Sequence, residues 1–204
     1  MRILAAAAVP IGVMLILTVG RGGYLGAAAG MLSVVPFVER RARAFVLGGI
    51  GVAVVLSFYP PVFEAVATRG TSYRIGIWMT YLEWAWETPL IGQGMIASVH
   101  RVIGGIEFSH AHNLMISALT RGGPLGLAGM VIVLGAGVYW SWTYARRFGE
   151  PVFLAMIIAL CVAGLFDYEL LLKPPDWTWV TFWLPVGLAA GAEIALRSGR
   201  LPRT

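Results

Sequence analysis

Long apolar stretches alternate with short polar ones along the chain, and this pattern predicts membrane-spanning helices. A helix needs about 20 apolar residues to cross roughly 30 Å of hydrocarbon, where its backbone polar groups must be paired within the helix. Six stretches qualify, at about residues 3–19, 22–38, 44–63, 125–144, 151–171 and 177–196. We therefore expect an all-α integral membrane protein with about six transmembrane helices, in one polytopic domain over residues 1–204.

The composition agrees with this pattern and excludes an ordinary soluble domain. Of the residues, 58% are hydrophobic and 12% are charged, against roughly 25% charged in a typical soluble protein. A net charge of +5 would fit a nucleic-acid partner if the basic residues formed one patch. They lie instead in short clusters between the apolar stretches. We expect membrane lipids around the chain and no nucleic acid.

The basic clusters also orient the predicted helices, because Lys and Arg gather in cytoplasmic loops. The strongest clusters lie at 39–43, 146–147 and 197–203, and strict alternation places all three on one side. Both termini are then expected in the cytoplasm. The opposite side receives a turn at Arg21 and a long loop, residues 64–122, which holds all three histidines. We expect short interfacial helices in this loop.

Counting along the helices, at about 1.5 Å per residue, places three polar features at one depth. Arg21 falls at the outer edge of the hydrocarbon. His112 begins a short helix over 113–119, and the Gly-Gly-Pro sequence at 122–124 turns the chain into the next span. Asp167 falls in the outer third of its span, where an ionisable residue suggests a functional site. A salt-bridged or water-exposed Asp167 is the alternative.

Other residues have architectural interpretations. Gly48, Gly49 and Gly51 permit close contact between helices. Trp78 suits the membrane–water interface, where an indole ring has one wet edge, and stacking on a substrate is the alternative. The loop arginines, Arg121 among them, are expected at lipid headgroups.

The histidine-rich part of the loop admits several interpretations. His100, Glu107, His110 and His112 could be offered as a metal site. The H-x-H spacing suits an extended strand, however, whereas helical metal ligands are spaced as in H-E-x-x-H. A structural histidine and a proton-transferring histidine remain, and imidazole is well suited to act as a general base near neutral pH. We expect no metal ion and no cofactor.

The residues that follow His112 carry a resemblance to a known family. His112-Asn113, nine further residues and then the GPLG sequence at 123–126 resemble the H-N-x9-G-x-x-G signature of the bacterial O-antigen ligase and polymerase superfamily. Arg74, Trp78 and the TPLIGQG sequence at 88–94 resemble the family's Arg, its Trp four residues on and its P-L-x-G-x-G turn. The GRGG sequence at 20–23 is similar to its S-R-G turn.

The resemblance implies a glycosyltransferase of bacterial lipopolysaccharide biosynthesis. Such an enzyme moves an O-antigen-type glycan from a polyprenyl pyrophosphate carrier to an acceptor hydroxyl, such as that of lipid A-core, at the periplasmic face of the inner membrane. It implies that His112 is the base or hydroxyl-orienting group and that Arg74 and Arg21 bind the pyrophosphate. It also implies that Asn113, Trp78 and Asp167 bind the substrates. A metal-independent transfer with inversion is expected.

Three alternatives stay open at this point. The first is an O-antigen polymerase, because Leu127 stands where ligases often have Gly, Thr or Tyr. The second is a protein O-oligosaccharyltransferase, because the donor chemistry is shared. The third is a non-catalytic or truncated membrane module. The chain resembles the carboxyl-terminal, catalytic half of a larger ligase-type protein. A fragment, a late start and a partner that supplies the rest are equally compatible with this resemblance.

Overall fold

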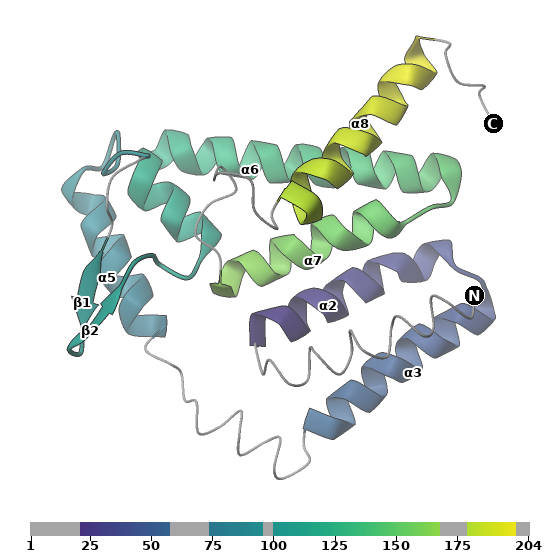
Figure 1. Cartoon of the computed structure of the whole chain (residues 1–204), viewed down its shortest axis with the longest axis horizontal. Helices are drawn as coiled ribbons and strands as arrows, with labels where there is room; N and C mark the ends of the chain where they lie inside the picture. The colour runs from purple at the N-terminus through teal and green to yellow at the C-terminus, as the bar shows by residue number, and fades with distance from the viewer. Residues whose placement is uncertain (1–20, 58–73, 96–99, 168–178, 199–204) are drawn as a thin grey trace.

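The computed structural model describes residues 21–57, 74–95, 100–167 and 179–198, and these residues are mainly helical (Figure 1). The helices are α2 (Arg21–Val34), α3 (Arg40–Ser57), α5 (Arg74–Glu87), α6 (Leu114–Phe148), α7 (Val152–Asp167) and α8 (Leu184–Arg197). A 3-10 turn, η1 (Val35–Phe37), follows α2, and a π-helical turn, η2 (Trp179–Trp183), precedes α8. The predominantly helical class is confirmed.

A small antiparallel hairpin, which the sequence pattern did not predict, lies between α5 and α6. Its strands are β1 (Arg101–Ile103) and β2 (Ile106–Phe108), with Arg101 opposite Phe108. Gly104 and Gly105 form the turn with φ of 61° and 81°, values that favour glycine. His100, just before β1, pairs with Glu107 of β2 at 2.8 Å.

Helices occur in five of the six predicted spans, and the first, 3–19, lies outside the described residues. Among the described residues, α6 is the one helix both long and apolar enough to cross a membrane on its own. Shorter apolar helices cover Gly22–Phe37, Val152–Phe166 and Trp179–Ala195. That these shorter helices cross the bilayer, and that the loop faces the periplasm, stay predictions.

Helices α2 and α7 approach each other closely through small residues. Gly22, Gly26 and Gly30 recur every four residues along α2, on one face of the helix. A Cβ atom on Gly26 would lie 2.6 Å from the Ala159 carbonyl oxygen, and one on Gly30 would lie 2.7 Å from that of Ala155. Small residues on both helices thus allow a contact of the kind that drives helix association in membranes.

The prediction that the glycines of α3 permit close helix contact has no support among the described residues, and it stays a prediction. Within the described part of the chain, no atom lies within 4 Å of a Cβ position at Gly48, Gly49 or Gly51. We expect glycines to pack between helices, and among the described residues those of α2 do so. Spacing of four residues, which places glycines in line on one helix face, separates the two cases.

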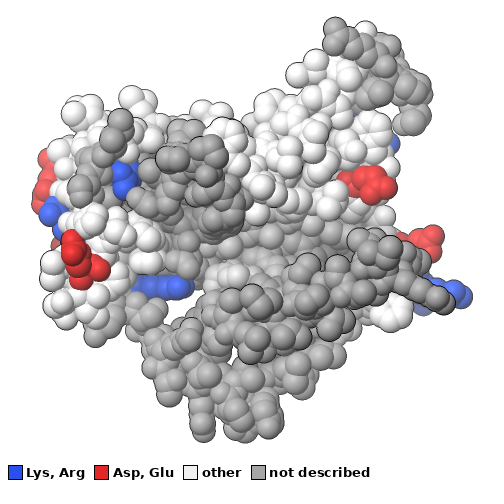
Figure 2. Space-filling view, in the orientation of Figure 1, with Lys and Arg blue, Asp and Glu red and all other residues white. Residues whose placement is uncertain are grey.

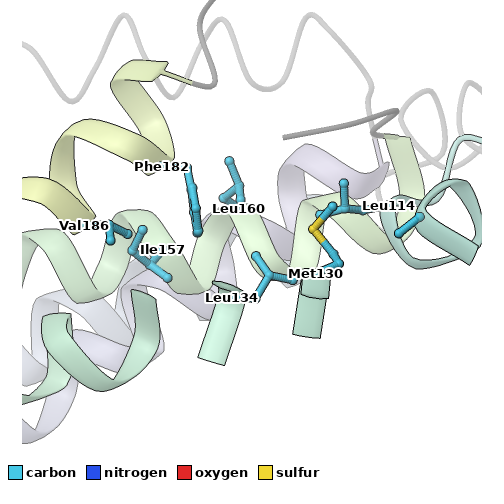
Figure 3. Close-up of a cluster of buried hydrophobic side chains, with 8 residues drawn as sticks. Leu114, Met130, Leu134, Ile157, Leu160, Phe182 and Val186 are labelled. Carbon is cyan, nitrogen blue, oxygen red and sulfur yellow. The ribbon is translucent and has the colours of Figure 1, made fainter. Parts of the chain in front are cut away.

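The main hydrophobic core joins α6, α7, η2 and α8 (Figure 3). Phe182 of η2 and Val186 of α8 reach toward Ile157 and Leu160 of α7, and Leu134 of α6 lies against the same cluster. Gly137 leaves room for this contact, since a Cβ there would lie 3.2 Å from the Phe182 ring. The core fixes the long part of α6 beside α7.

The charged side chains lie toward the two ends of this bundle. On the face shown in Figure 2, the coloured residues gather near the hairpin at one end and near the last turn of α6 at the other. At the latter end Arg147 pairs with Glu193 of α8 at 3.5 Å, and the Glu193 side chain is 7% exposed. Between the two ends, the described residues visible in this view are uncharged.

Candidate functional site

A backbone break divides α6 into a short first segment and a long second one. Gly123 has φ 60° and ψ −160°, a combination open essentially to glycine alone. Pro124 has no N–H, so the Thr120 carbonyl loses the partner that a continuous helix would provide. Residues 114–122 are therefore angled against the rest of the helix (Figure 1). The predicted break at 122–124 is confirmed.

The turn at 88–94 docks onto this break through its backbone. The N–H of Gln93 donates to the Thr120 carbonyl at 2.8 Å, and the N–H of Gly94 donates to the Arg121 carbonyl, also at 2.8 Å. These two carbonyls precede the break by three and two residues, so the helix does not pair them with its next turn. The Gln93 side-chain amide also donates to the Trp84 carbonyl of α5 at 3.2 Å.

Two glycines make this close approach possible. A Cβ on Gly92, whose φ is 66°, would lie 2.5 Å from the backbone nitrogen of Gly123. A Cβ on Gly123 would lie 2.6 Å from the Leu90 carbonyl oxygen. The glycines of two sequences some thirty positions apart are therefore explained by one contact, in which two backbones meet without side chains.

Asn113 caps α6 and ties it to α7. Its Oδ1 accepts hydrogen bonds from the backbone N–H of Met115 at 2.9 Å and of Ile116 at 3.0 Å. Its Nδ2 donates to the Leu165 carbonyl at 2.9 Å. That carbonyl belongs to the last turn of α7, where carbonyls have no partner within the helix. A buried side chain thus satisfies two helix ends at once, while substrate binding by Asn113 stays a prediction.

His112 lies directly before this cap, in a strained backbone conformation. Its φ is 50°, in the left-handed region that non-glycine residues rarely adopt. Its half-buried ring lies against His110, with ring centroids 4.0 Å apart, and Phe108 presents an edge at 6.2 Å. Ser109 Oγ contacts His110 Nδ1 at 3.0 Å. The geometry therefore places His110, which the family signature does not include, in contact with the predicted base.

The four residues weighed as a metal site fall into two pairs. His100 pairs with Glu107 across the hairpin, whereas the ring of His110 lies against that of His112 at a tilt of 42°. Within the described ranges, no group of three or more His, Cys, Asp or Glu side chains is placed to hold a metal ion.

Helix α5 is held against the start of α6 and the end of the hairpin. The hydroxyl of Tyr81 donates to the Phe108 carbonyl at 3.1 Å, and the hydroxyl of Thr120 donates to the Tyr81 carbonyl at 3.2 Å. Both Tyr81 and Thr120 are 1% exposed. These residues position the site but match none of the family's motifs quoted above. Their signal in the sequence is weak, because a lone Tyr or Thr has many possible roles.

Arg74 and Trp78 lie on α5 toward the residues that precede His112. Trp78 packs, half-buried, against the cluster of Ile77, Tyr81 and Ala111. Arg74 is half-buried and begins α5 one turn before Trp78, on the same side of the helix. The structure thus places Trp78 beside the segment that carries His112, with Arg74 at the adjoining end of α5.

Arg21 and Asp167 are the first residue of α2 and the last residue of α7, and their side chains lie outside what the structure describes. The positions of these two helix ends follow from the contacts of the residues next to Arg21 and Asp167. A Cβ on Gly22 would lie 2.9 Å from the Phe166 Cβ, and Asn113 joins the same turn of α7 to α6. The three helix ends predicted to share one level therefore meet at one end of the bundle.

Arg121 does not lie where headgroup contact would place it, so that prediction is wrong. It is 6% exposed, and its Nη1 donates to the Met95 carbonyl at 3.2 Å. Arg101 has a different role, since its guanidinium lies 3.4 Å from the centroid of the Trp84 ring. Stacking of this kind fixes the hairpin on α5.

Comparisons with known proteins bear on this arrangement. The profile of the family described as O-antigen ligase matches residues 6–131. The O-antigen ligase of Pseudomonas aeruginosa strain PAO1 is 29% identical over an alignment of 185 residues, and the match covers 87% of this chain and 44% of that protein. The chain thus spans less than half the length of this relative. No solved structure shows a significant match.

Proposed function

The chain belongs to the O-antigen ligase family, and we propose that it carries the residues with which a membrane glycosyltransferase transfers an O-antigen-type glycan. The donor is a glycan on a polyprenyl pyrophosphate, the acceptor is a hydroxyl of lipid A-core, and the reaction takes place at the periplasmic face of the bacterial inner membrane. The observation that carries the proposal is the docking of the turn at 88–94 onto the break at Gly123. It joins two separate family sequences beside the helix that His112 precedes.

The chemistry requires a base and a group that accepts the charge of the leaving pyrophosphate. The acceptor oxygen attacks the anomeric carbon, the bond from that carbon to the pyrophosphate oxygen breaks, and the electron pair leaves with the pyrophosphate. The hydroxyl proton passes to the imidazole of His112. Direct attack of this kind inverts the anomeric centre.

Arg74 and Arg21 bind the pyrophosphate in this proposal. A guanidinium keeps its charge and presents paired donors to phosphate oxygens. Each arginine begins a helix, α5 or α2, at the end of the bundle that holds His112. Fixed positive charge in a water-poor cleft stabilises the negative charge that develops in the transition state. Because the arginines neutralise the leaving group, the transfer needs no metal ion.

The remaining residues hold or orient the reactants. Asn113 fixes the backbone next to His112 through its bonds to α6 and α7. Trp78 offers an aromatic face to the sugar, and Asp167, at the end of α7, orients His112 or binds the acceptor. Support for this grouping comes from the contacts of Gly22 and Asn113 with the last turn of α7.

Two related functions are alternatives: an O-antigen polymerase, which Leu127 leaves open, and a protein O-oligosaccharyltransferase. All three share the donor, so the product separates them. Glycan on lipid A-core identifies a ligase, a longer carrier-linked glycan identifies a polymerase, and a glycoprotein identifies the third.

The test is a chromosomal His112→Ala substitution in the source bacterium. We expect complete loss of glycan-bearing product on gels and accumulation of carrier-linked glycan, with unchanged protein in the membrane fraction by immunoblot. His100→Ala is the matched control, because His100 is exposed and paired with Glu107 on the hairpin. Normal product from the His112→Ala strain would remove the proposed base.

A further inference from the structure

One face of α5 is apolar and exposed, although this helix belongs to the predicted loop and not to a predicted span. Ile75, Met79 and Trp86 are 62%, 54% and 77% exposed. These three side chains and that of half-buried Leu82 lie within a sector of about 60° around the helix axis, at 3.6 residues per turn. The opposite face packs on the protein through the buried residues Ile77, Tyr81 and Ala85.

The exposed apolar surface continues beyond the end of α5. Leu90 and Ile91, in the turn that docks on α6, are each 77% exposed. The Leu90 carbonyl lies against Gly123, and Leu125, two residues further along α6, is 79% exposed. We call Ile75, Met79, Trp86, Leu90 and Ile91 the α5 surface. It adjoins, at Leu125, the helix that is long and apolar enough to cross a bilayer.

The direction of α5 agrees with this continuity. In Figure 1, α5 runs crosswise to the long part of α6, at the end where α6 bends. If α6 crosses the membrane, α5 lies close to the membrane plane at its outer end. Exposed Glu83 and Glu87 flank the apolar sector on one side, and Glu87 contacts Arg101 of the hairpin at 3.9 Å. A narrow apolar sector with charged residues beside it is typical of a helix that lies in a bilayer interface.

We propose that the α5 surface is immersed in the outer leaflet of the membrane, among the upper acyl chains of the bilayer lipids. Trp86 at its centre is a side chain that favours this depth. The turn at 88–94 then holds the bend of α6, and with it His112, at the level of the lipid headgroups. This inference concerns contact with lipid and does not depend on glycan transfer, so the two can fail separately.

Spin labels test the immersion directly. The protein carries Cys161→Ala, is reconstituted in nanodiscs of phosphatidylethanolamine and phosphatidylglycerol, and bears one label at Met79→Cys, Trp86→Cys or Ile91→Cys. We expect collisions with oxygen, which concentrates in lipid, to exceed those with a water-soluble nickel complex severalfold. At the matched positions Glu83→Cys and Glu87→Cys we expect the reverse.

Two results would overturn the proposal. A higher collision rate with the nickel complex at Trp86→Cys and Ile91→Cys would place the surface in water. Low collision rates with both reagents would mean that protein, either another segment of a longer chain or a second copy, covers it.

Fluorescence of unlabelled protein gives a second measurement that needs no cysteine. Lipids brominated near the top of the acyl chain should quench the wild-type emission more than that of Trp86→Phe, because the variant lacks the immersed indole. Equal fractional quenching of the two proteins would contradict immersion.

Discussion

The backbone N–H of Gln93 donates a 2.8 Å hydrogen bond to the carbonyl of Thr120, the carbonyl that Pro124 cannot pair. A turn that follows α5 thus supplies the bond that the bent helix α6 lacks. An unpaired carbonyl buried away from water is costly, so the bend and the docked turn stabilise each other. This relationship explains why two glycine-containing sequences occur together in one chain.

The first prediction concerns the two glycines at this contact. Gly123→Ala should lower the free energy of unfolding by about 1–3 kcal/mol from backbone strain alone, and more because of the contact with the Leu90 carbonyl. Gly92→Ala should behave alike. Thermal unfolding in detergent measures the loss. Gly129→Ala is the control, since nothing in the described structure lies within 4 Å of its Cβ position. If Gly129→Ala and Gly123→Ala lost the same amount of stability, the proposed contact would be contradicted.

The second prediction separates the two functions of Asn113. Asn113→Ala should cost about 1 kcal/mol for the lost helix cap and about 1 kcal/mol for the lost bond to Leu165. Asn113→Asp keeps the cap but has no N–H for that carbonyl, so its unfolding temperature should fall between those of wild type and Asn113→Ala.

The control for Asn113 is Thr143→Ala, which removes an exposed bond within α6 and should change stability little. If Asn113→Asp unfolds at the wild-type temperature, the bond to Leu165 contributes nothing measurable. Transfer activity should fall with stability in both Asn113 variants, because the backbone that carries His112 loses its anchor.

The third prediction concerns the close contact of α2 with α7. Gly26→Ala places a methyl group 2.6 Å from the Ala159 carbonyl oxygen, so the helices must separate. Overpacking of this kind costs about 1–3 kcal/mol, which a shift in thermal unfolding measures. Gly48→Ala on α3 meets no atom of the described residues and should leave the unfolding temperature near wild type or above it. The same shift for both variants would mean that α2 and α7 are not in close contact.

The fourth prediction tests how Arg74 acts. Arg74→Lys keeps the positive charge but loses the planar pair of donors, so kcat/KM for glycan transfer should fall about tenfold, or about 1.4 kcal/mol. Arg101→Lys is the matched control, because a lysine retains a cation over the Trp84 ring. Unchanged transfer by Arg74→Lys would show that paired hydrogen bonding to phosphate is not its role.

Several features of the fold could be predicted from single stretches of sequence. The helical class follows from apolar runs too long for a soluble domain, and the break in α6 follows from a Gly-Gly-Pro sequence that no continuous helix accommodates. From the family motifs we predict that His112, Asn113 and Arg74 are site residues, and this stays a prediction. The headgroup prediction for Arg121 was wrong, and the packing prediction for the glycines of α3 has no support among the described residues. Glycine content did not identify which helix packs closely, and the charge of Arg121 gave no indication that its side chain is buried.

The sequence by itself determined where helices form and bend, because backbone geometry and hydrophobic length are local properties. Only the tertiary structure decided which groups meet. The bond from Gln93 to Thr120 spans the loop, that from Asn113 to Leu165 joins two helices, and the ring of His110 lies on that of His112. The first two contacts satisfy polar groups that a helix end or a break leaves unpaired. Such a group can be located from the sequence, but its partner depends on how distant segments pack.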